Sequence, residues 1–169
     1  MNITQIKVGY LQANCYILEK ENNIIIIDPG DEYEKIKSYI KDKNIVKILI
    51  THSHPDHISA LKYFDKNLIL KDIEEKEYNF NPFKFEVIFT KGHTSDSVTY
   101  YFKEEKVMFT GDFLFKESIG RTDLPTGDNK QMKESLEKIK KYDENIKIYP
   151  GHGEMTTLKH EKENNIFLK

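Results

Sequence analysis

The sequence predicts an α/β protein in which two β-sheets pack face to face and helices cover their outer faces. Short apolar segments rich in β-branched residues, typical of strands, occur in runs rather than singly. Amphipathic segments with helical spacing separate these runs, which favours a layered sandwich over a simple doubly wound sheet. The chain has 169 residues, a length that suits one domain with a sizeable core.

The first part of the chain carries the clearest element signals. Residues 24–27 are isoleucines, a run that suits a strand buried on both faces, and the Asp-Pro-Gly that follows ends it. Tyr33, Ile36 and Ile40 recur at helical spacing among charged residues. We therefore expect strands at residues 3–8, 14–19, 23–28 and 46–50, and helices at residues 32–41 and about 58–64.

The second part of the chain is expected to supply the other sheet. Residues 68–87 lack a clear period, and we expect one short strand and a loop there. Met132, Leu136 and Ile139 recur at helical spacing and predict an amphipathic helix. The remaining strands are expected at residues 86–90, 97–102, 106–110 and 146–149, and helices at residues 131–142 and from about 155 onward.

The composition of the chain excludes several classes of function. The formal net charge is −2, from 26 basic and 28 acidic side chains, which gives no general attraction to nucleic acid or to anionic membranes. No apolar run approaches the roughly 18 residues that span a bilayer, and residues 1–6 lack the pattern of a signal peptide. The single cysteine, Cys15, lies in an apolar segment and is expected to be a buried strand residue. We therefore expect a cytoplasmic protein with no nucleic-acid or membrane partner.

The segment THSHPDH, residues 51–57, places three histidines and an aspartate directly after an expected strand. In extended backbone, residues two apart point to the same side, so His52 and His54 can reach one cation together. The proline after His54 favours an extended residue before it and begins a helix well, so Asp56 and His57 lie in the first helical turn and point elsewhere. One short segment can thus serve two neighbouring metal positions, and its ligands suit zinc, iron or manganese.

Other metal-binding side chains also follow expected strands, where a rigid sheet can hold distant segments together. These side chains are Asp28, His93, Asp112 and His152. With His93, Asp112 and His152 added to the motif, seven ligands are available, and a carboxylate such as Asp112 can bridge two cations. A lone histidine near a strand end is usually an ordinary surface or core residue, and His160, in the Lys- and Glu-rich tail, is interpreted in that way. The motif is different, because burying its imidazoles without a cation would leave polar groups without partners.

These motifs resemble those of the metallo-β-lactamase superfamily, and the match extends from about Asn14 to Gly153. The motifs occur in the family's order as His52-x-His54-x-Asp56-His57, Gly92-His93-Thr94, Thr110-Gly111-Asp112 and Gly151-His152. The resemblance implies a four-layer αββα sandwich over residues 1–169, with the metal site at one edge between the sheets. It implies a first metal on His52, His54 and His93, a second on Asp56, His57 and His152, Asp112 as a bridge, and Asp28 as a support.

Two segments, residues 119–128 and Asn14–Ile17, resemble the glyoxalase II-like hydrolases and the persulfide dioxygenases. True β-lactamases of this fold usually have cysteine or serine at the position of Asp112, which argues against lactam hydrolysis. The chain ends soon after His152, so we expect no C-terminal helical domain of the kind that holds glutathione. Asp96 stands where the family usually has glycine, and its carboxylate could face solvent or change the charge of the site.

The resemblance implies a metal-dependent hydrolase of small-molecule thioesters. We expect the chain to be a monomer or a weak dimer, although no patch in the sequence decides its oligomeric state. Two divalent cations, zinc first with iron or manganese as alternatives, would hold a bridging hydroxide that Asp56 orients. Arg121 and Asp123 would form a pair that braces the metal loop, a role favoured over contact with substrate. The alternative is a mononuclear iron persulfide dioxygenase that uses His52, His93 and Asp112. A protein that keeps metal without turnover is a third and weaker interpretation.

Overall fold

The isoleucine strand lies inside the first of two sheets. The computed structural model describes residues 1–169, and this sheet has the order β1-β2-β3-β4. Its strands are β1 (Asn2–Val8), β2 (Ala13–Lys20), β3 (Asn23–Ile27) and β4 (Asn44–Leu49). The first three strands are antiparallel, and β4 runs parallel to β3 after the crossover helix α1 (Tyr33–Ile40). Successive isoleucines of β3 point into two different apolar cores, so the strand is buried on both faces as predicted.

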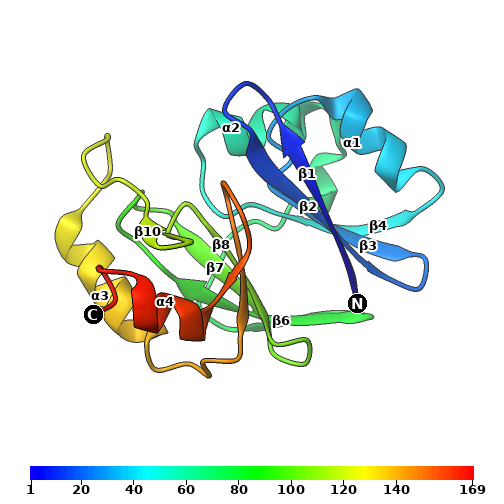
Figure 1. Ribbon diagram of the computed structural model, residues 1–169. Helices are drawn as coiled ribbons and strands as arrows, with labels where there is room; N and C mark the ends of the chain where they lie inside the picture. Colours follow the sequence, from blue (N-terminus) through cyan, green and yellow to red (C-terminus); the bar gives the residue numbers. More distant parts are fainter.

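The second sheet has the order β12-β11-β8-β7-β6-β5. Its strands are β5 (Glu77–Phe80), β6 (Phe83–Phe89), β7 (Val98–Phe102), β8 (Val107–Gly111), β11 (Lys147–Pro150) and β12 (Thr156–Thr157). Two helices, α3 (Asn129–Ile139) and α4 (Leu158–Asn164), cover its outer face, and a small hairpin, β9 (Leu114–Phe115) and β10 (Ser118–Ile119), precedes α3. Figure 1 shows the blue and cyan first half packed against the green-to-red second half. The expected four-layer αββα sandwich is therefore confirmed.

Three apolar clusters match the three interfaces between the four layers. The cluster between the sheets has 14 buried residues and is rich in aromatic rings, such as the edge-to-face pair Tyr16–Phe109 with centroids 5.0 Å apart. The other two clusters lie between each sheet and its helices. The helix α3 contributes Met132, Leu136 and Ile139 to one of them, the residues whose spacing predicted it.

The segment after the THSHPDH motif differs from the expected helix of about two turns. The helix α2 (Pro55–Ile58) has a single turn and passes into 3₁₀ turns at Ser59–Tyr63 and Lys66–Leu68. Its continuation is diverted because the backbone N of Ala60 donates to Pro29 O (3.1 Å) instead of extending the helix. The strand β6 also begins earlier than expected, and β9, β10 and β12, at two residues each, are too short to show a period. No helix has both the length and the apolar character needed to cross a membrane.

Candidate metal centre

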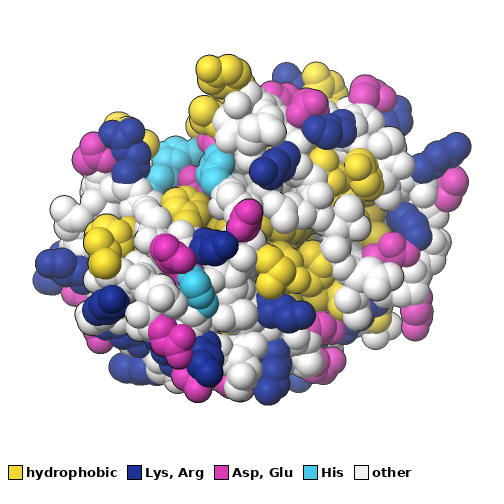
Figure 2. Space-filling model, viewed as in Figure 1, with side chains coloured by type: hydrophobic (Ala, Val, Ile, Leu, Met, Phe, Trp, Pro, Cys, Tyr) yellow, Lys and Arg dark blue, Asp and Glu magenta, His cyan; other side chains and the backbone are white.

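The polar residues that follow the strands all gather at one edge of the sandwich. The first half supplies Asp28 after β3, and His52, His54, Asp56 and His57 after β4 and in α2. The second half supplies His93 after β6, Asp112 after β8 and His152 after β11. Figure 2 shows histidine side chains, in cyan, clustered beside acidic ones at the upper left of the molecule. Both sheets therefore contribute side chains to one site.

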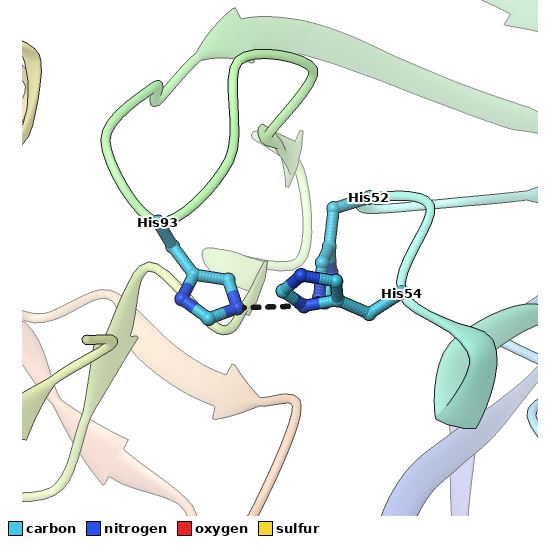
Figure 3. Close-up of side chains that lie close together, drawn as sticks. All are labelled: His52, His54 and His93. Carbon is cyan, nitrogen blue, oxygen red and sulfur yellow. Dashed lines mark hydrogen bonds between the residues drawn. The ribbon is translucent and has the colours of Figure 1, made fainter. Parts of the chain in front are cut away.

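The first group consists of three histidines whose ring nitrogens converge. His54 Nδ1 lies 3.0 Å from His52 Nε2 and 3.0 Å from His93 Nε2. Figure 3 shows His93 approaching from one side and His52 and His54 from the other. The ring nitrogens all lie within 4.8 Å of one another, a spacing that allows one cation to bind all three imidazoles.

The second group combines a carboxylate with two imidazoles. Asp56 Oδ2 lies 3.2 Å from His152 Nε2 and 3.6 Å from His57 Nε2. His57 is fully buried, whereas the side chains of Asp56 and His152 are 22% and 28% exposed. This group therefore opens toward solvent, where a substrate could approach.

The carboxylate of Asp112 lies between the two groups. Its Oδ1 is 3.4 Å from His57 Nε2, in the second group. Its Oδ2 is 3.6 Å from His93 Nε2, in the first group, and 3.5 Å from His152 Nε2, in the second. A carboxylate so placed can bind a cation on each side.

The unsatisfied atoms of the centre show that these residues fit metal ions. His57 Nε2 and Asp112 Oδ1 are buried and face each other without a hydrogen-bond partner. Unpaired buried polar atoms are costly, and a cation would satisfy both of these. The donor set of imidazoles and carboxylates is that of zinc, iron or manganese sites.

The protonation of the two groups differs. Burial lowers the pKa of His52 to about 4, with His57 acting in the same direction, and burial also lowers the pKa of His54. Burial acts against the charged form of His57 as well, but the carboxylates of Asp112 and Asp28 outweigh it and raise its pKa to about 10. At neutral pH His52 and His54 therefore have free lone pairs, while His57 in the metal-free chain is protonated between the carboxylates of Asp28 and Asp112.

Most of the histidines are oriented by a fixed oxygen on the far side of the ring. His93 Nδ1 faces Arg121 O (2.8 Å), and His152 Nδ1 faces Leu11 O (3.2 Å). His57 Nδ1 faces Asp28 Oδ2 (2.9 Å). Such partners set the tautomer and direct Nε2 toward the cation.

Asp28 lies behind the centre, in a supporting position. Its Oδ1 accepts from Thr51 N (2.8 Å), and its Oδ2 accepts from Thr51 Oγ1 (2.6 Å) and faces His57 Nδ1 (2.9 Å). Asp28 also lies near His52 and His57 in a spacing that could bind metal. Because both its oxygens are already used by these donors, we assign it to orientation rather than to metal binding.

Two other residues singled out in the sequence lie at the margin of the centre. Arg121 Nε and Nη2 donate to the two oxygens of Asp123 (2.7 Å each), with side chains 61% and 68% exposed. The pair braces only its own loop, and it is the backbone oxygen of Arg121 that reaches the centre, at His93. Asp96 is exposed. The partial burial of its carboxyl group acts to raise the pKa of Asp96, but hydrogen bonds from Thr94 and Ser53 outweigh this effect and lower it. Asp96 therefore adds a negative charge beside the first group.

A cavity of about 570 Å³ adjoins the first group at His52. Its walls include apolar residues and two lysines, Lys71 and Lys91, neither of which forms an ion pair. Its lining residues are Ile50, His52, Leu70, Lys71, Asp72, Ile73, Phe89, Lys91, Ser95, Asp96, Ser97 and Val98. A cavity of this size can take part of a small-molecule substrate.

Sequence reasoning missed the residues that hold the centre from behind. Thr51 begins the THSHPDH segment but was given no role, and the backbone oxygens of Leu11 and Arg121 carry no signal in the sequence. Asn14 did carry a signal, since asparagine is depleted in strands and here stands in an otherwise apolar segment. A buried polar residue in a strand needs a partner, and that partner proves to lie at the metal centre.

Comparisons with known proteins agree with this geometry. The sequence profile described as the metallo-beta-lactamase superfamily matches residues 8–90 and 74–152. The "Probable metallo-hydrolase YqgX" of Bacillus subtilis (strain 168) is 34% identical over 99% of this chain and 98% of its own length. The "Hydroxyacylglutathione hydrolase GloC" of Haemophilus influenzae (strain ATCC 51907 / DSM 11121 / KW20 / Rd) is 32% identical over 99% of this chain and 98% of its own.

Solved structures are also similar. One described as BLEG-1 B3 metallo-beta-lactamase has a TM-score of 0.92 and 31% identity, over 99% of both chains. TTHA1623 in a di-iron-bound form has a TM-score of 0.89 and 30% identity, over 98% of this chain and 100% of the other. ETHE1 from Myxococcus xanthus has a TM-score of 0.85 and 25% identity, over 98% of this chain and 84% of the other. The fold, the gathered metal-binding side chains and these similarities agree, and the chain belongs to the metallo-β-lactamase superfamily.

Proposed function

We propose that this chain is a metal-dependent hydrolase of small-molecule thioesters, similar in activity to the glyoxalase II-like members of its superfamily. The observation that carries the proposal is the position of Asp112 between two groups of metal-binding side chains, with its Oδ1 and His57 Nε2 buried and unpartnered. The relative named as a hydroxyacylglutathione hydrolase supports a thioester as the substrate class.

In this proposal the two groups and the carboxylate between them hold two divalent cations, zinc first with iron or manganese as alternatives. His52, His54 and His93 would hold the first cation, Asp56, His57 and His152 would hold the second, and Asp112 would be shared. Two cations in such a site lower the pKa of a water toward neutrality and polarise the substrate carbonyl.

The chain's own residues then orient the reactants. A hydrogen bond from His152 lowers the pKa of Asp56 well below its usual value, so this carboxylate stays ionised. An ionised carboxylate at the open side of the centre can accept a hydrogen bond from the nucleophile and orient it. The leaving thiolate needs little help from a general acid, because a thiol pKa is only about 8.5.

The experiment that tests the proposal measures thiol release from glutathione and coenzyme A thioesters, with the metal content of the same protein determined by elemental analysis. We expect about two metal equivalents per chain and hydrolysis of at least one thioester. His52→Ala should lower kcat/KM by at least about 100-fold, because it removes a ligand of the first cation. His160→Ala is the matched control and should keep the rate, since His160 bonds to Glu117 away from the centre. Hydrolysis at the wild-type rate by metal-depleted His52→Ala would show that the site is misassigned.

A second candidate is a mononuclear iron persulfide dioxygenase. The structural similarity to ETHE1 is compatible with it, and the residues it would use, His52, His93 and Asp112, lie together. About one equivalent of iron, with oxygen uptake in the presence of glutathione persulfide, would select this activity over hydrolysis. A chromogenic cephalosporin belongs in the same substrate panel because of the similarity to the B3 enzyme. Efficient lactam hydrolysis would contradict the argument from Asp112.

A further inference from the structure

Asn14 is a fully buried polar side chain within strand β2 of the first sheet. Its Nδ2 donates to the backbone oxygens of Pro150 (2.9 Å) and Gly153 (3.1 Å), which belong to the second half. Its backbone N donates to Gly151 O (2.7 Å). One residue of the first sheet thus holds, at three points, the loop that carries His152.

The hydrogen bonds of Asn14 fix the orientation of its amide. Backbone oxygens can only accept, so the NH₂ group must face Pro150 and Gly153. The amide oxygen then accepts from Gln5 Nε2 at 2.7 Å. Every polar atom of the side chain is satisfied, and an aspartate of the same shape would place an acceptor against two carbonyl oxygens.

The two metal-binding groups are held across the sheets by different contacts. Near the first group, Val98 N donates to Thr51 O (2.9 Å) and Tyr100 Oη donates to Ile50 O (2.7 Å). Near the second group, the cross-sheet contacts come from Asn14, from Tyr16 Oη and from Gln5 Nε2, which donates to Gly153 O (3.2 Å). A substitution at Asn14 should therefore disturb the geometry of the second group and leave that of the first group unchanged.

His152 depends on this support more than the other ligands of its group. Its side chain is 28% exposed, whereas that of His57 is fully buried. Besides the contact of its Nε2 with Asp56 within the group, its ring is oriented through Nδ1, which faces Leu11 O at 3.2 Å and is exposed to solvent. The position of His152 relative to Asp56 and His57 is therefore set through its loop.

We infer that Asn14 is a positioning residue for the second cation, which it serves by holding the His152 loop of one sheet against the other sheet. This inference rests on the proposed two-cation centre. Asn14 touches neither cation nor substrate, and its effect passes through the backbone of Pro150, Gly151 and Gly153. Removing such an outer contact weakens metal binding about 10- to 100-fold in other sites.

The experiment compares cation binding by the wild-type chain and by Asn14→Asp, using equilibrium dialysis against a competing chelator. We expect the second equivalent to bind about 10- to 100-fold more weakly in the variant, with the first unchanged. Hydrogen exchange of residues 150–153 in the metal-free protein gives an independent readout and should be faster in the variant.

Asn165→Asp is the matched control. Asn165 is also fully buried, and its Nδ2 donates to Ser118 O (3.1 Å) and Glu161 Oε2 (2.9 Å), so the same exchange disrupts a similar amide away from the His152 loop. A merely structural loss would appear equally in both variants, whereas only Asn14→Asp should lose the second cation selectively.

The outcomes separate this inference from the proposed function. If the wild-type chain binds a single cation, the two-cation proposal fails and the inference falls with it. If the wild type binds two and Asn14→Asp binds both as tightly, only the inference is overturned. Should Asn14→Asp not fold, Tyr16→Phe carries the same test, since it removes only the Oη that donates to Pro150 O (2.6 Å). Tyr16→Phe should weaken binding of the second cation by a smaller factor than Asn14→Asp. Unchanged binding of that cation would overturn the inference.

Discussion

At the scale of single residues, Asp28 orients one ligand in each of the two groups, although it is not itself assigned as a ligand of either. Its Oδ2 faces His57 Nδ1 directly and accepts from Thr51 Oγ1, and Thr51 Oγ1 in turn lies 3.1 Å from His52 Nδ1. Because the hydroxyl proton of Thr51 is used on Asp28, its oxygen is left to accept from His52. Both rings are thereby oriented with Nε2 toward the metal positions, and at His57 a cation would replace the proton on Nε2.

The proton on His57 predicts that the two cations respond differently to pH. With the pKa of His57 raised to about 10, the second cation must displace a proton at neutral pH. We expect its affinity to rise about tenfold per pH unit from about pH 7 to about pH 9. The first cation should show a weaker dependence, because the pKa of His52 is lowered to about 4. Chelator competition at several pH values measures the affinities for both cations. An equal dependence of the two affinities on pH would contradict the assignment of His57 to the second cation.

The proton on His57 also makes the stability of the metal-free fold depend on pH, in the opposite direction to the affinity for the second cation. The folded pKa of His57 lies above its ordinary value of 6.5, so the proton stabilises the folded state. This contribution is complete below about pH 6.5 and is lost as the pH rises through about 10. Metal binding and the stability of the metal-free chain should thus change in opposite senses over this range.

At the scale of elements, the position of α2 depends on the turn that ends β3. A Cβ atom at Gly30 would lie 1.7 Å from Asp56 O and 3.3 Å from His57 Cα, so only glycine allows this approach. The nearby hydrogen bond from Ala60 N to Pro29 O ends the helix on the same turn. The turn and the short helix therefore form one unit that places Asp56 and His57 of the second group.

Gly30→Ala should displace α2 and weaken binding of the second cation by at least about tenfold. His52 and His54 precede the helix, so binding of the first cation should change much less. Titration of the metal-free variant with zinc, followed by a competing chelator, measures the two affinities. Equal weakening of both, or of neither, would contradict the role given to this turn.

At the scale of the whole molecule, each metal-binding group takes side chains from both sheets. The apolar core between the sheets joins the two halves, and bound cations would join them again at the edge. The metal-free chain should therefore be less stable, since a ligand that binds only the folded state stabilises it. Each bound cation contributes about 2.7 kcal/mol when its free concentration is about 100 times its Kd.

Loss of one cation should lower the Tm by about 5–11 °C, and chelation of both by about twice that, because 1 kcal/mol moves the Tm of a chain of this size by about 2–4 °C. Differential scanning calorimetry with and without chelator measures the shift, and restored metal should reverse it. A variant that lacks Asp112 should show a smaller shift, and an equal one would mean that the cations bind elsewhere.

Most of the fold could be predicted from local patterns. The isoleucines of β3 and the spacing of Met132, Leu136 and Ile139 identify their elements, because burial on one or two faces imposes a period. Strands were not predicted where the segment is too short to show a period, as in the two-residue strands β9, β10 and β12. The helix after the motif was predicted too long because its end is set by the distant Pro29 O.

The sequence by itself determined which side chains can bind metal, that they follow strands, and the family whose motifs they match. These are local properties, since ligand chemistry belongs to single residues and strand ends are marked by period and turn residues. Only the tertiary structure decided which nitrogens and oxygens face one another, which tautomers they hold, and what supports them. Asn14 and Pro150, whose contact holds the His152 loop, are 136 residues apart. Such contacts depend on the register between two separately folded sheets, and no local period in the chain encodes that register.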